Sequence, residues 1–200
     1  MPSMHKVMLT AIVLGSGPIA AQAPSDTLPF RRGQWGVQFR PSTDAAGLGA
    51  LRFRNRSSAW VVDVRAYVND SWTFGGGERR SIGSGGDFRA GLRRYRLAAP
   101  RVARFFTIGG TGGYTVNRQT SEGYPDQQLL SGSVGVYGDV GAAVFVAPYF
   151  SLGASTQASL MATGDRYVYT ATPTSPRSET RRAGWWAGFG GITVLATLYF

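Results

Sequence analysis

The sequence predicts an all-β protein, an eight-stranded antiparallel up-and-down transmembrane β-barrel preceded by a signal peptide. Three observations predict this fold. The chain begins with a segment typical of export signals. Eight later stretches alternate apolar with polar side chains, which is the pattern of strands that separate two environments. The links between these stretches are alternately short and long, as in barrels with tight turns at one end.

Residues 1–23 have the layout of a secretory signal peptide. A short basic start precedes an apolar run at residues 7–14, and small residues lead to Ala21 and Ala23. We expect cleavage after Ala23. The apolar run is too short for a membrane-spanning helix, which needs about 20 residues.

The mature chain is expected to form a short N-terminal segment, residues 24–33, and one barrel domain, residues 34–200. Within the barrel, period-two alternation marks the strands. The stretches are residues 34–40, 48–56, 60–69, 88–95, 105–117, 131–146, 150–161 and 185–200. Several approach the roughly 9 to 11 residues that a tilted strand needs to cross a bilayer.

The links between these strands indicate how the barrel is oriented. The links at residues 55–59, 97–104 and 147–149 are short, whereas those at residues 70–87, 119–130 and 165–182 are long and polar. The first link on the long side, residues 42–47, is short. Tight turns on the periplasmic side and longer loops outside are typical of outer-membrane barrels with both termini in the periplasm.

The polar face of the strands is expected to fill the barrel interior. This interior cluster comprises Arg52, Arg54, Asp63, Arg65, Arg93, Tyr95, Tyr137, Asp139 and Gln157. The opposite face, including Leu51 and Phe53, is nearly uncharged and suits lipid, where a midplane Arg costs about 2 to 4 kcal/mol. Aromatic residues near the strand ends are expected to form interfacial girdles. They are Trp35, Trp60, Phe105, Tyr114, Phe150 and Trp186.

The last strand alternates apolar side chains up to the final residue. These side chains are Ile192, Val194, Ala196, Leu198 and Phe200. The ending resembles the terminal-aromatic signal read by the barrel-assembly machinery, although such signals commonly carry an aromatic where this chain has Leu198. The mature length and link pattern resemble the small outer-membrane barrels OmpX and the OmpA membrane domain. This resemblance implies an outer-membrane location among lipid and lipopolysaccharide, with periplasmic chaperones and the assembly machinery as partners.

Chemistry that the chain lacks narrows its function. It has no cysteine, and its only histidine, His5, leaves with the signal, so thiolate sites, histidine metal sites and Ser-His-Asp triads are excluded from the mature chain. Asp63 and Asp139 are a candidate carboxylate pair for glycoside hydrolysis. A role in neutralising interior arginines is favoured, because a charge inside a narrow barrel must be paired. We expect no enzyme activity and no cofactor.

The formal net charge is +10 at pH 7 and comes almost wholly from arginine. These arginines are dispersed over the strands instead of forming one basic face, which argues against nucleic-acid binding. We expect a structural or surface-interaction protein, with specificity toward an unidentified extracellular ligand in the long outside loops. Three alternatives stay open: a narrow anion-preferring channel lined by the excess arginines, a soluble periplasmic lipid-binding barrel with its apolar face inside, and a tail-anchor helix at residues 183–200.

Overall fold

The computed structural model describes residues 28–41, 46–73, 79–121, 126–170 and 176–200, and over these residues the chain is antiparallel β-sheet joined by turns. Its strands are β1 (Trp35–Pro41), β2 (Ala46–Asn55), β3 (Ser58–Thr73), β4 (Arg79–Ala99), β5 (Val102–Ser121), β6 (Gln127–Ala147), β7 (Phe150–Tyr169), β8 (Ser178–Phe189) and β9 (Thr193–Tyr199). The predicted signal peptide and its cleavage site lie outside the described residues.

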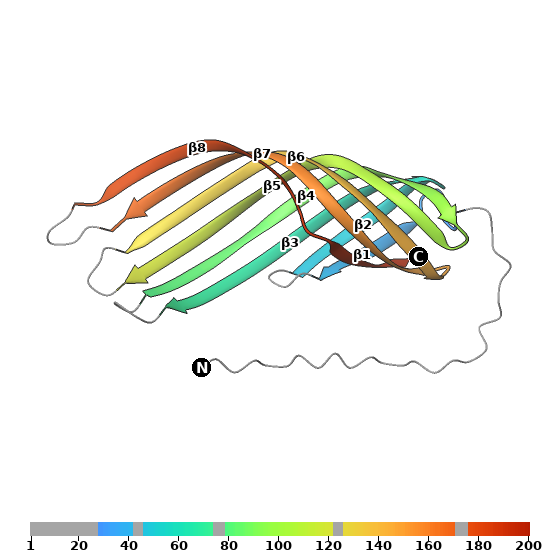
Figure 1. The fold of residues 1–200 in the computed structure, drawn as a ribbon, viewed down its shortest axis with the longest axis horizontal. Coiled ribbons are helices and arrows are strands. Elements are labelled where there is room, and N and C mark those ends of the chain that lie inside the picture. The colour runs from blue at the N-terminus through green and yellow to red at the C-terminus, as the bar shows by residue number, and fades with distance from the viewer. Residues whose placement is uncertain (1–27, 42–45, 74–78, 122–125, 171–175) are drawn as a thin grey trace.

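The sheet closes into a ring. Each strand from β1 to β7 pairs with the next in the chain, and β9 pairs with β7 on one side and with β1 on the other (Figure 1). Because β8 also pairs with β7, β8 and β9 are two parts of one interrupted strand, and the described sheet has eight positions around the ring. The predicted eight-stranded antiparallel barrel is therefore confirmed.

Residues 190–192 interrupt the last strand. On β7, Ala158 lies opposite Phe189 and Ser155 lies opposite Thr193, so the register shifts by one residue across the interruption. Even-numbered side chains of β8 consequently share the inward face with odd-numbered side chains of β9. A single strand over residues 185–200 was expected, and a helix there was the alternative; both are wrong. Among the described residues, no helix is long and apolar enough to cross a membrane.

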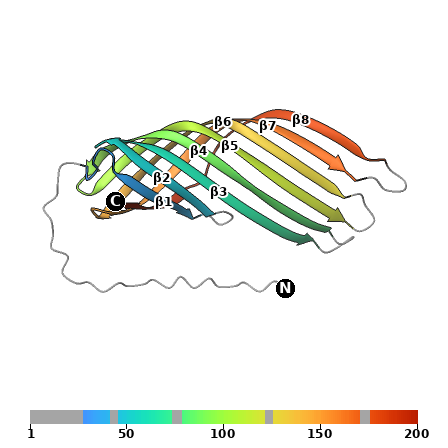
Figure 2. The same cartoon turned by 180° about the vertical axis from the view of Figure 1, so that it is seen from behind.

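The two ends of the barrel differ in their connections. Short turns join β2 to β3, β4 to β5 and β6 to β7, as predicted. At the other end β3 to β8 run on as long paired hairpins, and β4 and β6 are each 21 residues long (Figure 2). The prediction of long irregular loops over residues 70–87, 119–130 and 165–182 is wrong for the described parts of these segments. Their polar composition suggested loops, although the strands continue to pair through these segments.

The outward face carries an uncharged band. On β4 and β5 the outward side chains of residues 82–92 and 106–116 are uncharged, and Arg94 and Arg80 bound the band on β4. Its exposed apolar side chains include Val62, Val64, Phe88, Ile108, Val136, Val140 and Leu160. Each stretch matches the roughly 9 to 11 residues that cross a bilayer. An apolar exterior is the arrangement of a membrane barrel and contradicts the soluble alternative, which needs the apolar face inside.

The orientation of β2 differs from the prediction. Leu51 and Phe53 are 0% and 1% exposed inside the barrel, whereas Arg52 and Arg54 point outward. The two guanidinium groups lie 5.4 and 5.3 Å from the ring centroids of Trp35 and Trp60, respectively. Placing Arg52 and Arg54 in the interior was therefore wrong. Near the short turns the interior is filled by apolar side chains, so the polar side chains of β2 face outward there.

Candidate functional site

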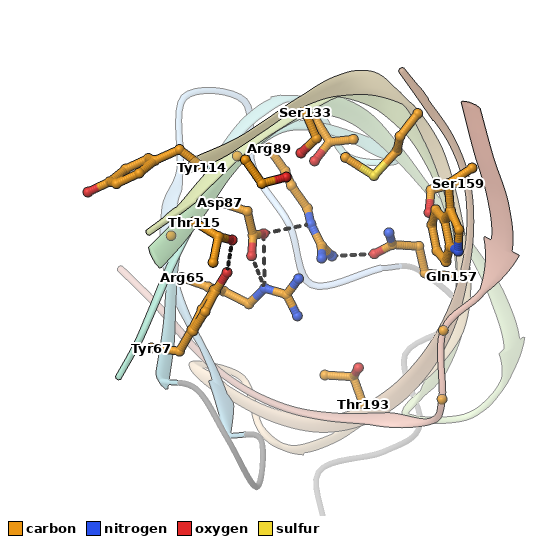
Figure 3. Close-up of a pocket in the computed structure, with 18 of the residues that line it drawn as sticks. Arg65, Tyr67, Asp87, Arg89, Tyr114, Thr115, Ser133, Gln157, Ser159 and Thr193 are labelled. Carbon is orange, nitrogen blue, oxygen red and sulfur yellow. Dashed lines mark hydrogen bonds and ion pairs between the residues drawn. The ribbon is translucent and has the colours of Figure 1, made fainter. Parts of the chain in front are cut away.

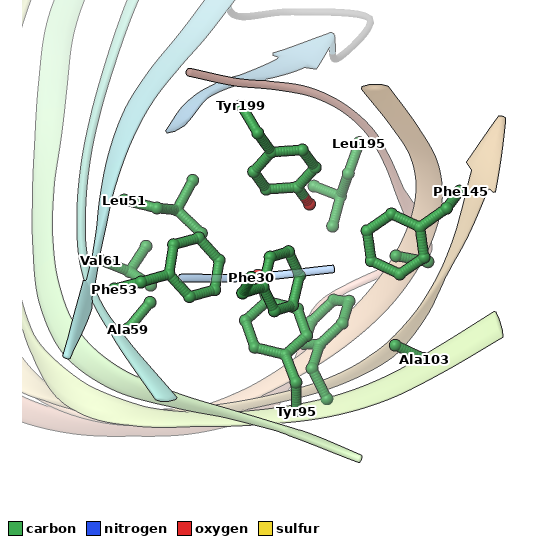
Figure 4. Packing of buried hydrophobic residues seen from close by; sticks show 12 residues of the cluster. Phe30, Leu51, Phe53, Ala59, Val61, Tyr95, Ala103, Phe145, Leu195 and Tyr199 are labelled. Atoms are coloured by element: carbon green, nitrogen blue, oxygen red, sulfur yellow. The ribbon is translucent and has the colours of Figure 1, made fainter. Parts of the chain in front are cut away.

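An aromatic plug fills the barrel at the end that carries the short turns. Phe30 lies at its centre and stacks on Phe53 with 4.0 Å between ring centroids (Figure 4). Tyr95 and Tyr199 approach the same ring at 4.8 and 5.2 Å. The other members are Leu51, Ala59, Val61, Ala103, Phe105, Ala143, Phe145 and Leu195. Phe30 is 2% exposed, so the segment before β1 closes this end of the barrel.

The plug corrects one expectation and adds a contact to another. Phe105 was predicted to lie in an outward girdle, but it is 5% exposed and lies inside the plug. Residues 24–33 were expected to form a short segment before the barrel, and the described part of this segment contributes Phe30 to the plug. Gly33 N donates to Phe53 O at 2.8 Å, which fixes the end of this segment against β2 and holds Phe30 in the lumen. Alternation could not reveal Phe30, because it lies outside every strand.

A layer of buried ion pairs lies above the plug. Asp139 accepts from Arg40 Nη2 and Arg93 Nη2 at 3.3 and 3.4 Å, and all three side chains are nearly fully buried. Asp63 Oδ1 lies 3.5 Å from both Arg40 Nε and Gln38 Nε2. Burial strengthens each attraction but makes an unpaired charge costly, so these groups depend on one another.

Neighbouring side chains hold Arg93 in this layer. Its guanidinium donates to Gln38 Oε1 at 2.7 Å and to Thr107 Oγ1 at 2.9 Å, and it lies 4.3 Å from the ring centroid of Phe105. Arg93 therefore joins the charged layer to the plug beneath it. Gly49 leaves room for Asp63 on the neighbouring strand, since a Cβ at this glycine would collide with the carboxylate. These contacts fix the two carboxylates among arginines, an arrangement suited to charge neutralisation.

A polar cavity of about 450 Å³ lies in the other half of the barrel (Figure 3). Arg65 Nε contacts both Asp87 carboxylate oxygens at 3.0 Å, and Arg89 Nε lies 3.2 Å from Asp87 Oδ1. Arg89 also donates to Gln157 Oε1 across the lumen. Serines and threonines of β5 to β7, together with Trp186, complete most of the wall. Two guanidinium groups and one carboxylate therefore line the cavity.

The structure brings most of the predicted interior residues together. Asp63, Arg93 and Asp139 lie in the charged layer, Tyr95 in the plug, and Arg65 and Gln157 at the cavity. Tyr137 is also buried, with its ring centroid 5.8 Å from the Arg89 guanidinium.

Three charged residues of the interior, Arg40, Asp87 and Arg89, were not included in the predicted interior cluster. Arg40 and Arg89 stand on the polar face of their strands, so alternation alone could have identified both. Asp87 had been assigned to a loop. Its pairing opposite Arg65 on β3 places it inside the barrel.

The remaining predicted residues and metal chemistry add little to this site. Of the expected assembly-signal residues, Val194, Ala196 and Leu198 of β9 and the final Phe200 face outward, with Leu198 43% and Phe200 73% exposed. Ile192 precedes β9 and lines the cavity instead. The described residues contain no group of three or more histidine, cysteine or acidic side chains that could hold a metal ion.

A solved structure resembles this barrel. It is the crystal structure of a major outer membrane protein from Thermus thermophilus, which aligns with a TM-score of 0.57 and 12% sequence identity. The alignment covers 84% of this chain and 98% of that chain. At this identity the likeness shows the fold alone. No protein-family model matches the chain, and no curated protein matches it.

Proposed function

We propose that this chain is a non-enzymatic outer-membrane barrel with a structural or surface-interaction role, carried by the hairpins that project beyond its uncharged band. The observation that supports it most is that β3 to β8 continue past this band as paired strands. Ion pairs cross-link these extensions. Arg80 bonds to Asp70 at 2.9 Å, Arg118 to Asp126 at 3.1 Å, and Arg166 to Glu179 at 2.7 Å. Such ribbons present a stable shape to the surroundings. The likeness to the Thermus outer membrane protein supports the location.

Shortening one hairpin tests this role without touching the barrel. Ser71 lies opposite Ser81 and Asp70 lies opposite Ile82, so replacing residues 71–81 by Asn-Gly preserves the register. We expect the variant to reach the outer membrane and to keep a heat-modifiable band on gels, while the cells lose surface adhesion or resistance to detergent. Unchanged adhesion and resistance after the same shortening of all three long hairpins would contradict the proposal.

The plug argues against the narrow anion channel. Phe30 and its aromatic neighbours fill the lumen near the turns, and the buried ion pairs fill the layer above them. We expect no discrete conductance from the purified protein in planar bilayers. Reproducible anion-selective steps that disappear in Arg65→Gln would favour the channel instead.

Export and assembly belong to the same proposal. A signal peptide cleaved after Ala23 would deliver the chain to periplasmic chaperones, and the outward-facing end of β9 would be read by the barrel-assembly machinery. Phe200 fits this role because its side chain is exposed while its backbone N–H donates to Trp35 O at 3.0 Å. Deleting Phe200 should slow assembly in cells more than refolding in detergent. An equal effect in both would argue for a purely structural role of this residue.

A further inference from the structure

The wall of the barrel is incomplete beside the polar cavity. β8 pairs with β7 alone, because β1, its neighbour around the ring, is short and pairs with β9. On the other side of β1 and β2, β3 pairs with β2 only as far as Ala66 and from there only with β4. Within the described residues, two strand edges therefore lack backbone partners in this half of the molecule, as the short β1 and β2 in Figure 1 illustrate.

Exposure of β8 shows that this gap opens the interior. On β5 to β7 the inward-facing side chains are buried or half-buried, but on β8 the inward-facing Trp186, which was expected in an outward girdle, is 49% exposed. The link between β8 and β9 lines the cavity with Gly190, Gly191 and Ile192. A Cβ built at Gly191 would meet nothing within 4 Å. The cavity is therefore open through the side of the barrel.

This side opening lies at the level of the bilayer. Residues 183–189 of β8 pair with residues 158–164 of β7, and charged outward side chains begin only at Arg181 and Arg166. Hydrocarbon cannot satisfy the backbone N–H and C=O groups of an unpaired edge. A polar group inserted at the opening would form hydrogen bonds with the unpaired edge and would also reach the cavity behind it.

The charge of the cavity selects an anion. Arg65 and Arg89 share the single carboxylate of Asp87, and the terminal nitrogens of Arg65 point toward the middle of the lumen (Figure 3). A second anionic group would balance the excess positive charge and accept charge-assisted hydrogen bonds. Toward the opening the wall becomes apolar at Trp186 and Ile192. This combination suits a molecule with an anionic head and a hydrocarbon tail.

We infer that the cavity binds the anionic headgroup of a membrane amphiphile, which enters from the bilayer between β8 and β3 and leaves its acyl chain outside, against the apolar surface. Arg65 and Arg89 bind the headgroup, and the link at residues 190–192 forms the edge of the entrance. An apolar groove runs over the outer surface of β5 to β8, lined by Ile108, Leu160 and Phe189. It reaches the entrance at Phe189, next to the link at residues 190–192, and offers a place for a chain that bends around the end of β8. This inference is independent of the role proposed for the outer hairpins.

Native mass spectrometry of the folded barrel in an uncharged detergent tests the inference. Dodecyl phosphate is the probe, dodecanol tests the chain alone, and inorganic phosphate tests the free anion. We expect one dodecyl phosphate per barrel, no retained dodecanol, and no competition from phosphate at equal concentration. Arg65→Gln and Arg89→Gln should each weaken binding by about tenfold or more, since hydrogen bonds to charged groups are involved. Arg52→Gln and Arg54→Gln remove the same charge from the outer face and should leave binding unchanged.

A blocking variant tests the route of entry. Gly191→Trp adds bulk where the structure has free space, so the barrel should fold, as its heat-modifiable band would show, and binding should be lost although both arginines remain. Equal binding by the cavity variants and their outer-face controls would overturn the inference. So would full competition by inorganic phosphate, which would indicate a free-anion site. A dimer linked through β8 that binds no dodecyl phosphate would show that the edge serves a second copy instead.

Discussion

The two halves of the barrel interior both hold charged side chains, but they pack them to different degrees. Near the short turns, an aromatic plug and a layer of ion pairs leave little space, and Arg93 and Asp139 are almost wholly buried. In the other half the ion pairs of Arg65 border a cavity of about 450 Å³ beside an unpaired strand edge. The half near the short turns is closed and tightly packed, whereas the half with the cavity is accessible. Stability and recognition are thus placed in different layers of one barrel.

Neutralising one carboxylate in each half should show the largest difference. Asp139→Asn leaves the buried Arg40 and Arg93 without their shared counter-charge and should lower the free energy of unfolding by about 4 kcal/mol. Asp87→Asn acts beside the cavity, where Arg65 is 31% exposed although Arg89 is nearly buried, and should lower it by a smaller amount, roughly 2 kcal/mol. Urea unfolding in lipid vesicles, followed by the heat-modifiable band, measures both. Equal losses would mean that the two layers are equally buried.

The plug should respond to the volume of its central ring. Phe30→Ala removes a buried ring and should cost about 3 kcal/mol, whereas Phe30→Leu keeps most of the volume and should cost about 1 kcal/mol. The same unfolding measurement checks this order. If both variants match the unmodified protein, Phe30 does not lie in the lumen and the closed end must be held by the barrel strands alone.

The comparison of the halves also shows what alternation can predict. Val62, Asp63 and Val64 alternate in the middle of a strand, where outward means lipid, and the predicted orientation of Asp63 agrees with the structure. On β2 the same pattern was assigned in reverse, because Leu51 and Phe53 belong to a plug that depends on Phe30. Alternation gives the two faces of a strand but not which face is inside. That choice depends on what else fills the lumen.

The outer half was harder to predict because its composition is that of loops. Glycine and charged residues in the segment around Asp87 suggested irregular structure, yet Arg65 lies directly opposite this carboxylate in a regular ladder. The interruption at residues 190–192 was also concealed, since glycine is common throughout the chain, with 28 residues. The cavity arises from these two features together. The alternation of side chains along each strand could predict the arginines of the cavity, but it could not predict the missing part of the barrel wall.

Adding a methyl group to one glycine in each half should sharpen the contrast in packing. A Cβ at Gly49 collides with the carboxylate of Asp63, so Gly49→Ala should cost about 2 kcal/mol. At Gly132, on the outer face of β6 at the level of the cavity, a Cβ would meet nothing within 4 Å. Gly132→Ala should therefore leave the free energy of unfolding unchanged or raise it by about 0.5 kcal/mol, because alanine lowers the conformational entropy of the unfolded chain. A similar loss at both sites would contradict the difference in packing, and urea midpoints of the two variants decide it.

The smallest effect is expected from the ion pairs of the outer extensions. Hydrogen bonds from Arg166 and then Arg181 lower the pKa of the Glu179 carboxyl from 4.5 to about 2. Because the folded pKa is depressed, any stabilisation is complete above the ordinary pKa and is lost as the pH falls through about 2. These groups are exposed, so stability near pH 4 should hardly change. Carboxyl carbon chemical shifts of Glu179 in micelles should show ionisation maintained at pH 4, and Arg166→Gln should raise the pKa more than Arg181→Gln. A midpoint near 4.5 in the unmodified protein would mean that the extension is not cross-linked at this point and would weaken the proposed surface role.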